Sequence, residues 1–166
     1  MPPERSAPAP LRNLIRRSWR DWALLAEATV RMTALRLYLD YLGPVRQRKL
    51  YGKALTPAAG EAINAAMGLS LDQRRLARRI GWAIERAERV LPYDVVCLPQ
   101  AIVGRRMLRR RGIASVMFFG VETAKPLAEA GTHAWLIAGD VPVTGCRQAV
   151  RYKVFASYPT RMEAER

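Results

Sequence analysis

The chain has 166 residues, of which 50% are apolar and 25% are charged. This length fits one domain of ordinary size, and the apolar share can offset the entropy of ordering a core, which excludes wholesale disorder. The 28 Lys and Arg residues exceed the 14 Asp and Glu residues, and the resulting formal net charge of +14 favours anionic partners.

Cysteine usage and the N-terminal sequence bear on the cellular compartment. Two cysteines, Cys97 and Cys146, are too few for a disulfide framework, and no C-x-x-C zinc spacing occurs. The segment MPPERSAPAP lacks the basic start and apolar run of an export signal. Charged residues interrupt every apolar stretch before it reaches the roughly 18 residues of a membrane span. We therefore expect a cytoplasmic protein with no targeting segment and no transmembrane helix.

The N-terminal part of the chain reads as helical. Residues 1–10 contain four prolines and are expected to form a flexible lead-in. From Leu11 to Tyr41 apolar residues recur at spacings of three and four, which predicts one long amphipathic helix or two in series, ended by Gly43-Pro44. We assign residues 11–60 to this N-terminal helical segment. Its arginines and tryptophans would also suit an anionic membrane surface, although packing on the domain is the preferred interpretation.

Residues 61–160 are expected to form the core of the domain, and residues 161–166 a tail. Ser70 and Gln73 have the spacing of a capping box, so a helix should begin at Leu71. Asp94 offers the cap of a second helix that starts near Cys97. Helices followed by a strand meander predict an α+β fold. The predicted strands cover residues 113–121, 132–138, 141–144 and 150–156, with a turn at Gly139-Asp140.

Cys97 and His133 are the strongest candidates for catalysis. Cys97 is expected at a helix N-terminus, where backbone N–H groups stabilise a thiolate, and the single histidine follows thirty-six residues later on a predicted strand. The alternative is that Cys97 is a small buried hydrophobic residue and His133 a structural one. Together with Cys146 the pair could supply three zinc ligands, but no fourth ligand is evident and we expect no metal.

Several motifs around these two residues agree in order and spacing. The run ERAERVLPYDVVCLPQAIVGRRMLRRRGI is followed by SVMFFGV and then by GTHAWLIAGDVPVTG. With its helix-starting Cys, basic helix end, Gly-Val strand and His-Ala-Trp strand, the chain resembles the stand-alone transglutaminase-like cysteine peptidases of lasso-peptide biosynthesis over about residues 70–157. The resemblance implies N-terminal helices followed by a transglutaminase- or papain-like core, with the Cys-bearing helix packed on an antiparallel sheet.

The resemblance also implies an activity, which is removal of the leader from a ribosomally made lasso-peptide precursor. Cys97 would attack the amide that joins leader and core, and His133 would move the proton, with no cofactor. An ATP-dependent lasso cyclase would then close the macrolactam on the freed core amine. We expect a separate leader-recognition protein as a further partner, because the segment before residue 70 reads as helix throughout.

The group that orients His133 is left open by the sequence. Asp140 is the nearest downstream acid, but a hairpin turn at Gly139-Asp140 would place it at the far end of the strand and bring a residue near Gly145 opposite His133. In some relatives an acid stands near that position, and this chain departs from the pattern. The candidates are therefore Asp140, a backbone carbonyl and the Thr144 hydroxyl. The backbone N–H of Cys97 and of a neighbour would serve as oxyanion donors.

Other residues are assigned to substrate contacts. Trp135 shares a strand face with His133, and together with Gln100 and Thr144 it is expected to line the substrate pocket. A basic helix face would be either solvated or a docking patch for an acidic leader or its carrier. This face consists of Arg105, Arg106, Arg109 and Arg110, with Arg111 beside it.

A basic nucleic-acid-binding or membrane-surface module without catalysis is the alternative function. It predicts binding that survives the loss of Cys97. No nucleic-acid recognition motif occurs and the aromatic share is only 8%, so we expect no nucleic-acid partner. Peripheral membrane contact stays open.

Overall fold

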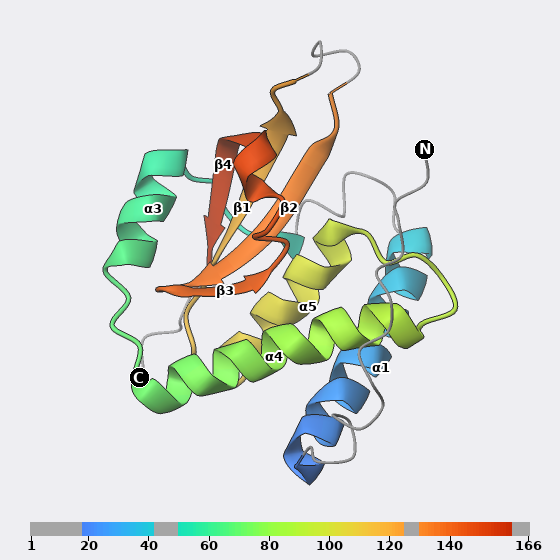
Figure 1. The fold of residues 1–166 in the computed structure, drawn as a ribbon. Helices are drawn as coiled ribbons and strands as arrows, with labels where there is room; N and C mark the ends of the chain where they lie inside the picture. The colour runs from blue at the N-terminus through green and yellow to red at the C-terminus, as the bar shows by residue number, and fades with distance from the viewer. Residues whose placement is uncertain (1–17, 42–49, 125–129, 161–166) are drawn as a thin grey trace.

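The computed structural model describes residues 18–41, 50–124 and 130–160 (Figure 1). Its helices precede a four-stranded antiparallel sheet, so the predicted α+β class is confirmed. The helices are α1 (Trp19–Tyr41), α3 (Pro57–Ala65), α4 (Leu71–Val90) and α5 (Cys97–Arg109). The strands are β1 (Val116–Glu122), β2 (Thr132–Ala138), β3 (Val141–Thr144) and β4 (Tyr152–Pro159), with a 3-10 helix at Ala149–Arg151.

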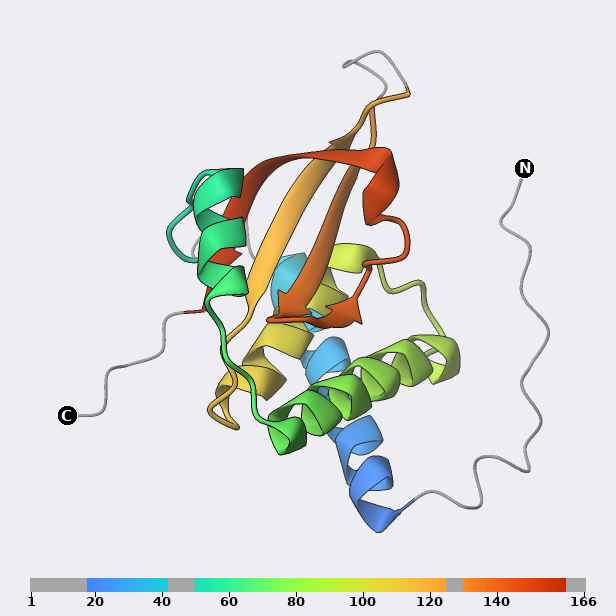
Figure 2. The same cartoon turned by 60° about the vertical axis from the view of Figure 1, so that its left-hand side comes forward.

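The sheet has the strand order β3-β2-β1-β4, which differs from the predicted meander. A meander would pair β4 with β3, whereas β4 pairs antiparallel with β1 on the opposite edge. After β3 the chain therefore crosses from one edge of the sheet to the opposite edge, over residues 145–151, before β4 begins (Figure 2). This crossing segment, residues 145–151, passes close to the middle strands and supplies part of the site described below.

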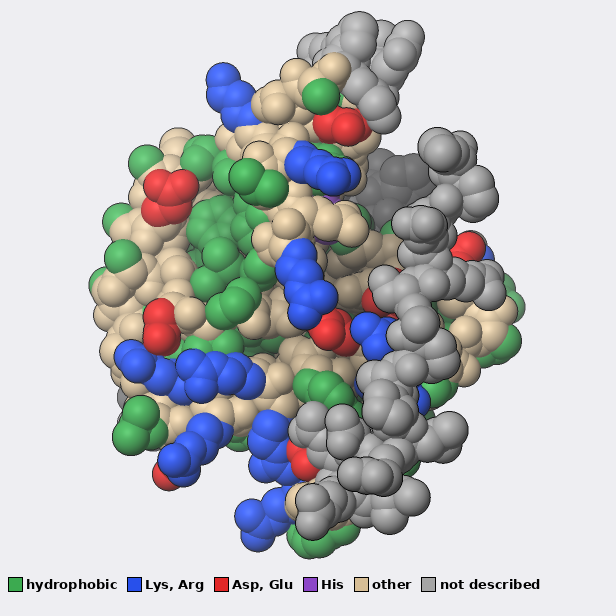
Figure 3. All heavy atoms as spheres, viewed as in Figure 1, with side chains coloured by type: hydrophobic (Ala, Val, Ile, Leu, Met, Phe, Trp, Pro, Cys, Tyr) green, Lys and Arg blue, Asp and Glu red, His purple; other side chains and the backbone are tan. Residues whose placement is uncertain are grey.

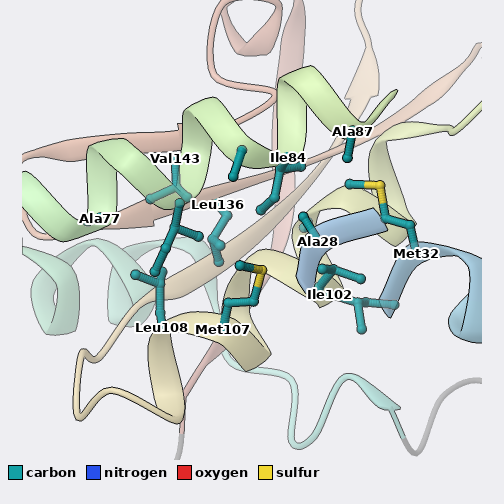
Figure 4. Packing of buried hydrophobic residues seen from close by; sticks show 14 of the residues in the cluster. Ala28, Met32, Ala77, Ile84, Ala87, Ile102, Met107, Leu108, Leu136 and Val143 are labelled. Atoms are coloured by element: carbon teal, nitrogen blue, oxygen red, sulfur yellow. The ribbon is translucent and has the colours of Figure 1, made fainter. Parts of the chain in front are cut away.

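Helices α4 and α5 cover one face of the sheet, and α1 packs against these two helices in the same hydrophobic core (Figure 4). A Cβ atom on Gly104 of α5 would lie only 2.8 Å from the side chain of Leu136 on β2, so the glycine lets helix and strand approach closely. Helix α1 shares this core with α4 and α5, so it packs as part of the fold. The buried residues include Ala28, Met32, Ala77, Ile84, Ala87, Ile102, Met107, Leu108, Leu136 and Val143.

Helix α3 covers part of the opposite face of the sheet. Gly60 lies against the side chains of Ser157 on β4 and Phe118 on β1. The Thr56 side chain accepts a hydrogen bond from the Ala59 N–H as the N-cap, and proline follows at the first helical position. The sequence patterns do not single out α3 as a separate helix, and its residues lie on both sides of the boundary expected between residues 60 and 61.

The starts of α4 and α5 differ in how they are capped. The predicted capping box is present, with the Gln73 N–H donating to Ser70 Oγ at 3.2 Å and the Ser70 N–H donating to Gln73 Oε1 at 3.0 Å. Helix α5 does begin at Cys97, but its N-cap is Val96, whose side chain makes no capping hydrogen bond. The predicted cap, Asp94, is wrong because it lies two residues too early and is exposed.

Some sequence predictions fall outside the described residues. These are the lead-in 1–10, the first turns of the helix predicted from Leu11, the Gly43-Pro44 stop and the tail 161–166. Within the described ranges, helix α1 begins at Trp19 and ends at Tyr41. No helix in these ranges combines the length and the apolar character needed to cross a membrane.

Candidate active site

The Cys97 sulfur lies against the backbone of β2. Cys97 is the first residue of α5 and is half-buried. Its Sγ accepts a hydrogen bond from the backbone N–H of Ala134 at 3.4 Å. Ala134 directly follows His133, so packing of α5 on the sheet brings the helix-starting thiol to the part of β2 that carries the only histidine.

The His133 ring is buried and held by a backbone carbonyl. Only 6% of the residue is exposed, and its Nε2 lies 2.8 Å from the carbonyl oxygen of Gly145. Because a carbonyl oxygen can only accept, Nε2 must carry the proton in this hydrogen bond. In the neutral ring Nδ1 is then unprotonated and can accept a proton.

Two aromatic rings pack against the imidazole. The Trp135 ring stacks on it at a centroid distance of 5.9 Å and an interplanar angle of 22°, and the Tyr152 ring lies at 4.9 Å. The close approach depends on Gly120, since a Cβ atom there would lie 2.7 Å from Tyr152 Cβ and 3.0 Å from the Trp135 ring. Sequence reasoning missed Tyr152, because β4 reaches this place only through the crossing segment.

Asp140 is not brought to His133. It lies in the β2–β3 turn, where its carboxylate is 3.2 Å from the Arg74 guanidinium. Ala138, at the turn, lies five residues after His133 along the strand, which is about 16 Å at about 3.3 Å per residue. Of the three candidate orienting groups, the structure places the backbone carbonyl beside the ring, which corrects the assignment of Asp140.

Thr144 faces away from the imidazole. It pairs with Leu136 on the sheet, and its methyl group is near Gly104 of α5, on the helix-covered face. Its hydroxyl oxygen is buried without a hydrogen-bond partner among the described residues. Thr144 therefore neither orients His133 nor lines an open pocket as expected.

Gln100 and Trp135, which were expected to line the substrate pocket, are both buried and contact other parts of the fold. Gln100 is 8% exposed and donates a hydrogen bond from Nε2 to the Val95 carbonyl at 3.1 Å, which braces the loop before α5. Trp135 is 5% exposed and stacks on Phe118 as well as on His133. Gln100 therefore acts on the segment that carries Cys97, whereas Trp135 forms one wall of the histidine site.

A hydrophobic surface adjoins the histidine on the sheet face that α5 does not cover. Figure 3 shows only a small part of the histidine at the surface, with a patch of hydrophobic side chains further to the left in this view. Partly buried Met67, Ile137 and Val154 pack there around Phe118 and Trp135. The surroundings of the ring are thus mainly apolar.

Cys146 has a different environment from Cys97. Both cysteines are free, and Cys146 Sγ donates to the carbonyl oxygens of Leu136 and Thr144 at 3.3 Å each. Burial raises the pKa of the Cys146 thiol, although backbone hydrogen bonds partly oppose this. Among the described residues no group of three or more His, Cys, Asp or Glu side chains could hold a metal ion.

The first turn of α5 can supply backbone donors beside the sulfur. The first four N–H groups of a helix have no partner within the helix, and no side chain caps this one. Pro99 lacks an N–H, so the donors nearest the sulfur are those of Cys97 and Leu98. These groups suit an anion that forms next to Cys97.

The four arginines of the predicted docking patch do not form one surface. Arg105 turns inward and donates to the carbonyls of Tyr51 and Leu50 at 2.7 and 3.0 Å, so it is structural. Arg106 and Arg109 line a cavity at the C-terminal end of α5. Arg110 lies elsewhere, beside the cluster in which the Glu27 carboxylate accepts from the Arg111 and Arg31 guanidinium groups.

Of three comparisons with known proteins, one finds a match to the chain. Neither the curated proteins nor the solved structures include a significant match to the chain. The domain family described as the transglutaminase-like superfamily matches residues 29–157. That range runs from α1 into β4, covers well over half of the chain, and includes both Cys97 and His133. The chain therefore belongs to the transglutaminase-like superfamily.

Proposed function

We propose that the chain is a cysteine endopeptidase that removes the leader from a ribosomally made lasso-peptide precursor. Membership of the superfamily supports acyl-transfer chemistry at a cysteine. The ordered motifs around Cys97 and His133, which resemble those of lasso leader peptidases, support the finer assignment.

One observation carries the proposal. The Cys97 sulfur, at the uncapped start of α5, accepts from the N–H of the residue that follows His133. With its Nε2 proton engaged by the Gly145 carbonyl, the imidazole offers Nδ1 as the base. A nucleophile and a base with a fixed tautomer are the minimum that thiol-dependent peptide cleavage requires.

In the proposed reaction, His133 Nδ1 takes the thiol proton and the Cys97 sulfur attacks the carbonyl carbon of the scissile amide. The backbone N–H groups of Cys97 and Leu98 donate to the oxyanion of the tetrahedral intermediate. The imidazolium then protonates the departing amine, and a thioester joins Cys97 to the leader. Water, deprotonated at Nδ1, hydrolyses the thioester, which frees the leader acid and regenerates the thiol.

The product chemistry indicates the partners. Cleavage frees the core amine, which a macrolactam-forming, ATP-dependent cyclase would join to an acidic side chain. A separate leader-recognition protein would present the precursor.

The test is to incubate the purified chain with a lasso precursor and its leader-recognition protein and to follow peptide masses. Wild type and Cys146→Ser should release leader and core, whereas Cys97→Ala should leave the precursor intact. Cys146→Ser is the matched control, because it changes the other free thiol while keeping a hydrogen-bond donor. Cleavage by Cys97→Ala at the wild-type rate would reject Cys97 as the nucleophile.

A second variant separates catalysis from binding. His133→Ala should lose turnover but should still bind the precursor, because the proposal gives its ring a proton-transfer role. Precursor binding is measured on Cys97→Ala as the reference. Lost binding with His133→Ala would instead indicate a recognition role for the side chain.

A further inference from the structure

A basic cavity lies at the end of α5 that is opposite Cys97. Its volume is about 390 Å³, within the range of ligand sites, and it is bounded by α5, the segment from Leu50 to Leu55 and the end of β4. Four of its lining residues are cations, and no Asp or Glu lines the cavity. The cations are Lys53, Arg105, Arg106 and Arg109.

Arg105 builds the wall of this cavity. Its guanidinium donates to the carbonyl oxygens of Leu50 and Tyr51, and a longer contact of 3.4 Å reaches the Tyr158 carbonyl. These bonds tie the segment after residue 50 to α5 and to β4. The cavity is therefore held by internal hydrogen bonds between three parts of the chain.

Within the described residues, no ion pair compensates the positive charge in the cavity. Lys53, Arg106 and Arg109 are exposed, and none of them takes part in an ion pair within the described ranges. Burial lowers the pKa of Arg105, and the charges of Arg109 and Arg106 lower it further. An anion in the cavity would relieve this repulsion between like charges.

The lining favours a peptide over an isolated phosphate. Phosphate sites commonly use backbone N–H groups at a helix N-terminus, whereas this cavity adjoins the C-terminal end of α5 and is lined by side chains of both cationic and apolar residues. Apolar side chains of Leu50, Leu55 and Pro159 line the cavity together with the cations. This combination suits a segment in which acidic side chains alternate with apolar ones.

The distance to Cys97 sets the spacing in such a peptide. Arg106 and Arg109 lie nine and twelve residues after Cys97 in the same helix, or about 14 and 18 Å along its axis. An extended peptide covers about 3.3 Å per residue. A chain that starts at Cys97 therefore needs at least about four residues to reach the cavity.

We propose that this cavity binds acidic side chains of the peptide substrate, at least about four residues from the bond that is cut. The identity of the peptide as substrate rests on the proposed function, whereas binding of an acidic peptide does not depend on catalysis. The cavity gives a substrate class to the proposed peptidase, namely precursors with an acidic and apolar leader segment.

The binding test uses the full chain with Cys97→Ala, so that no cleavage can occur. Two fluorescein-labelled twelve-residue peptides serve as probes, one alternating Glu with Leu and one alternating Gln with Leu, and binding is followed by fluorescence anisotropy. The Glu peptide should bind at least about ten-fold more tightly than the Gln peptide, and its affinity should fall with added salt.

A matched pair of charge variants locates the binding. Arg106→Gln/Arg109→Gln should weaken the Glu peptide about ten-fold, whereas Arg78→Gln/Arg89→Gln should change it by less than about two-fold. Arg78 and Arg89 are exposed on α4, so both double variants lower the net charge from +14 to +12. Equal weakening by the two variants would overturn the proposal, because it would indicate the overall positive field alone.

Two further outcomes would also overturn it. If the Glu peptide bound only after Glu163→Gln/Glu165→Gln, the occupant would be the acidic tail of this chain, which follows Thr160 at the cavity. If a DNA oligonucleotide displaced the peptide and depended more strongly on Arg106 and Arg109, the ligand would be a nucleic-acid phosphate.

A kinetic test connects the cavity to the peptidase. With the active chain and a precursor carrying Glu four to six residues before the cleaved bond, Arg106→Gln/Arg109→Gln should raise KM about ten-fold and leave kcat unchanged. An unchanged KM would contradict a role in substrate binding. Absence of cleavage by wild type would instead count against the proposed function, while the binding result on Cys97→Ala would still stand.

Discussion

The Gly145 carbonyl oxygen lies 2.8 Å from His133 Nε2, in the place where the side chain of an acid would orient the ring. A neutral carbonyl fixes the same tautomer as a carboxylate, because both accept the Nε2 proton. It stabilises an imidazolium less, since it carries only a partial charge. The orientation of the base therefore depends on the backbone of the crossing segment.

Gly145→Ala should impair catalysis more than stability alone explains. Gly145 has a φ of +70°, and a Cβ atom would lie 2.8 Å from the Ala134 carbonyl oxygen and 3.1 Å from His133 Nε2. We expect a stability loss of about 1 kcal/mol or more from the backbone strain and a fall in kcat of about ten-fold to a hundred-fold from ring displacement. Thermal unfolding and precursor cleavage measure the two effects.

Gly112→Ala is the matched control for this change. Gly112 also has a positive φ, +67°, but no atom lies within 4 Å of an added Cβ atom there. It follows the C-terminal end of α5, whereas Cys97 stands at the N-terminal end. It should lose similar stability and keep the wild-type kcat. A comparable loss of kcat in both variants would show that general destabilisation, and not contact with His133, causes the effect.

Asp140→Asn should leave kcat within about two-fold of wild type. The Asp140 carboxylate is 3.2 Å from Arg74 at a partly exposed turn, and such pairs contribute about 0–1 kcal/mol to stability. The measurement is the initial rate of precursor cleavage together with the midpoint of urea unfolding. A loss of turnover of a hundred-fold or more would return Asp140 to the catalytic machinery.

Tyr152→Ala should lower kcat by about ten-fold, because the ring that packs 4.9 Å from the imidazole is removed. Tyr152→Phe keeps the ring and should restore the rate. As a readout of ring orientation, the NMR signals of the single histidine should broaden or shift with Ala and not with Phe. If Phe is as slow as Ala, the hydroxyl group and not the ring is what matters.

Cys146 should resist alkylation in the folded chain at pH values where an ordinary thiol reacts. Burial raises the pKa of the Cys146 thiol, so in the folded state the thiol keeps its proton at pH values above about 8.5, the ordinary thiol pKa. In a Cys97→Ala background, iodoacetamide should label the folded chain slowly at pH 8.5 and the urea-unfolded chain at the usual rate. Equal rates would contradict the buried, donating thiol.

The same raised pKa has a consequence for stability. Below the ordinary thiol pKa both states hold the proton, and the contribution of Cys146 to stability is fully present. As the pH rises through the raised folded value, the unfolded state gains from ionisation first and this contribution is lost. Cys146→Ser should flatten the alkaline decline of the unfolding free energy, and an unchanged decline would assign it to other groups.

Local patterns in the sequence determined several parts of the site. The capping box at Ser70, the start of α5 at Cys97 and the β2–β3 hairpin were all predicted, because they depend on contacts between residues a few positions apart. The hairpin register also indicated that Asp140 would lie far from His133 and a residue near Gly145 close to it.

Only the tertiary structure decided which groups surround His133 and where the arginines point. Pairing of β4 with β1 brings Tyr152 to the imidazole, and the crossing segment brings the Gly145 carbonyl. Arg105 turns inward because its guanidinium donates hydrogen bonds to the carbonyls of Leu50 and Tyr51, more than fifty residues earlier in the chain. Arg106 and Arg109 stay exposed. Periodicity cannot encode such contacts, since they depend on how segments distant in the chain pack together.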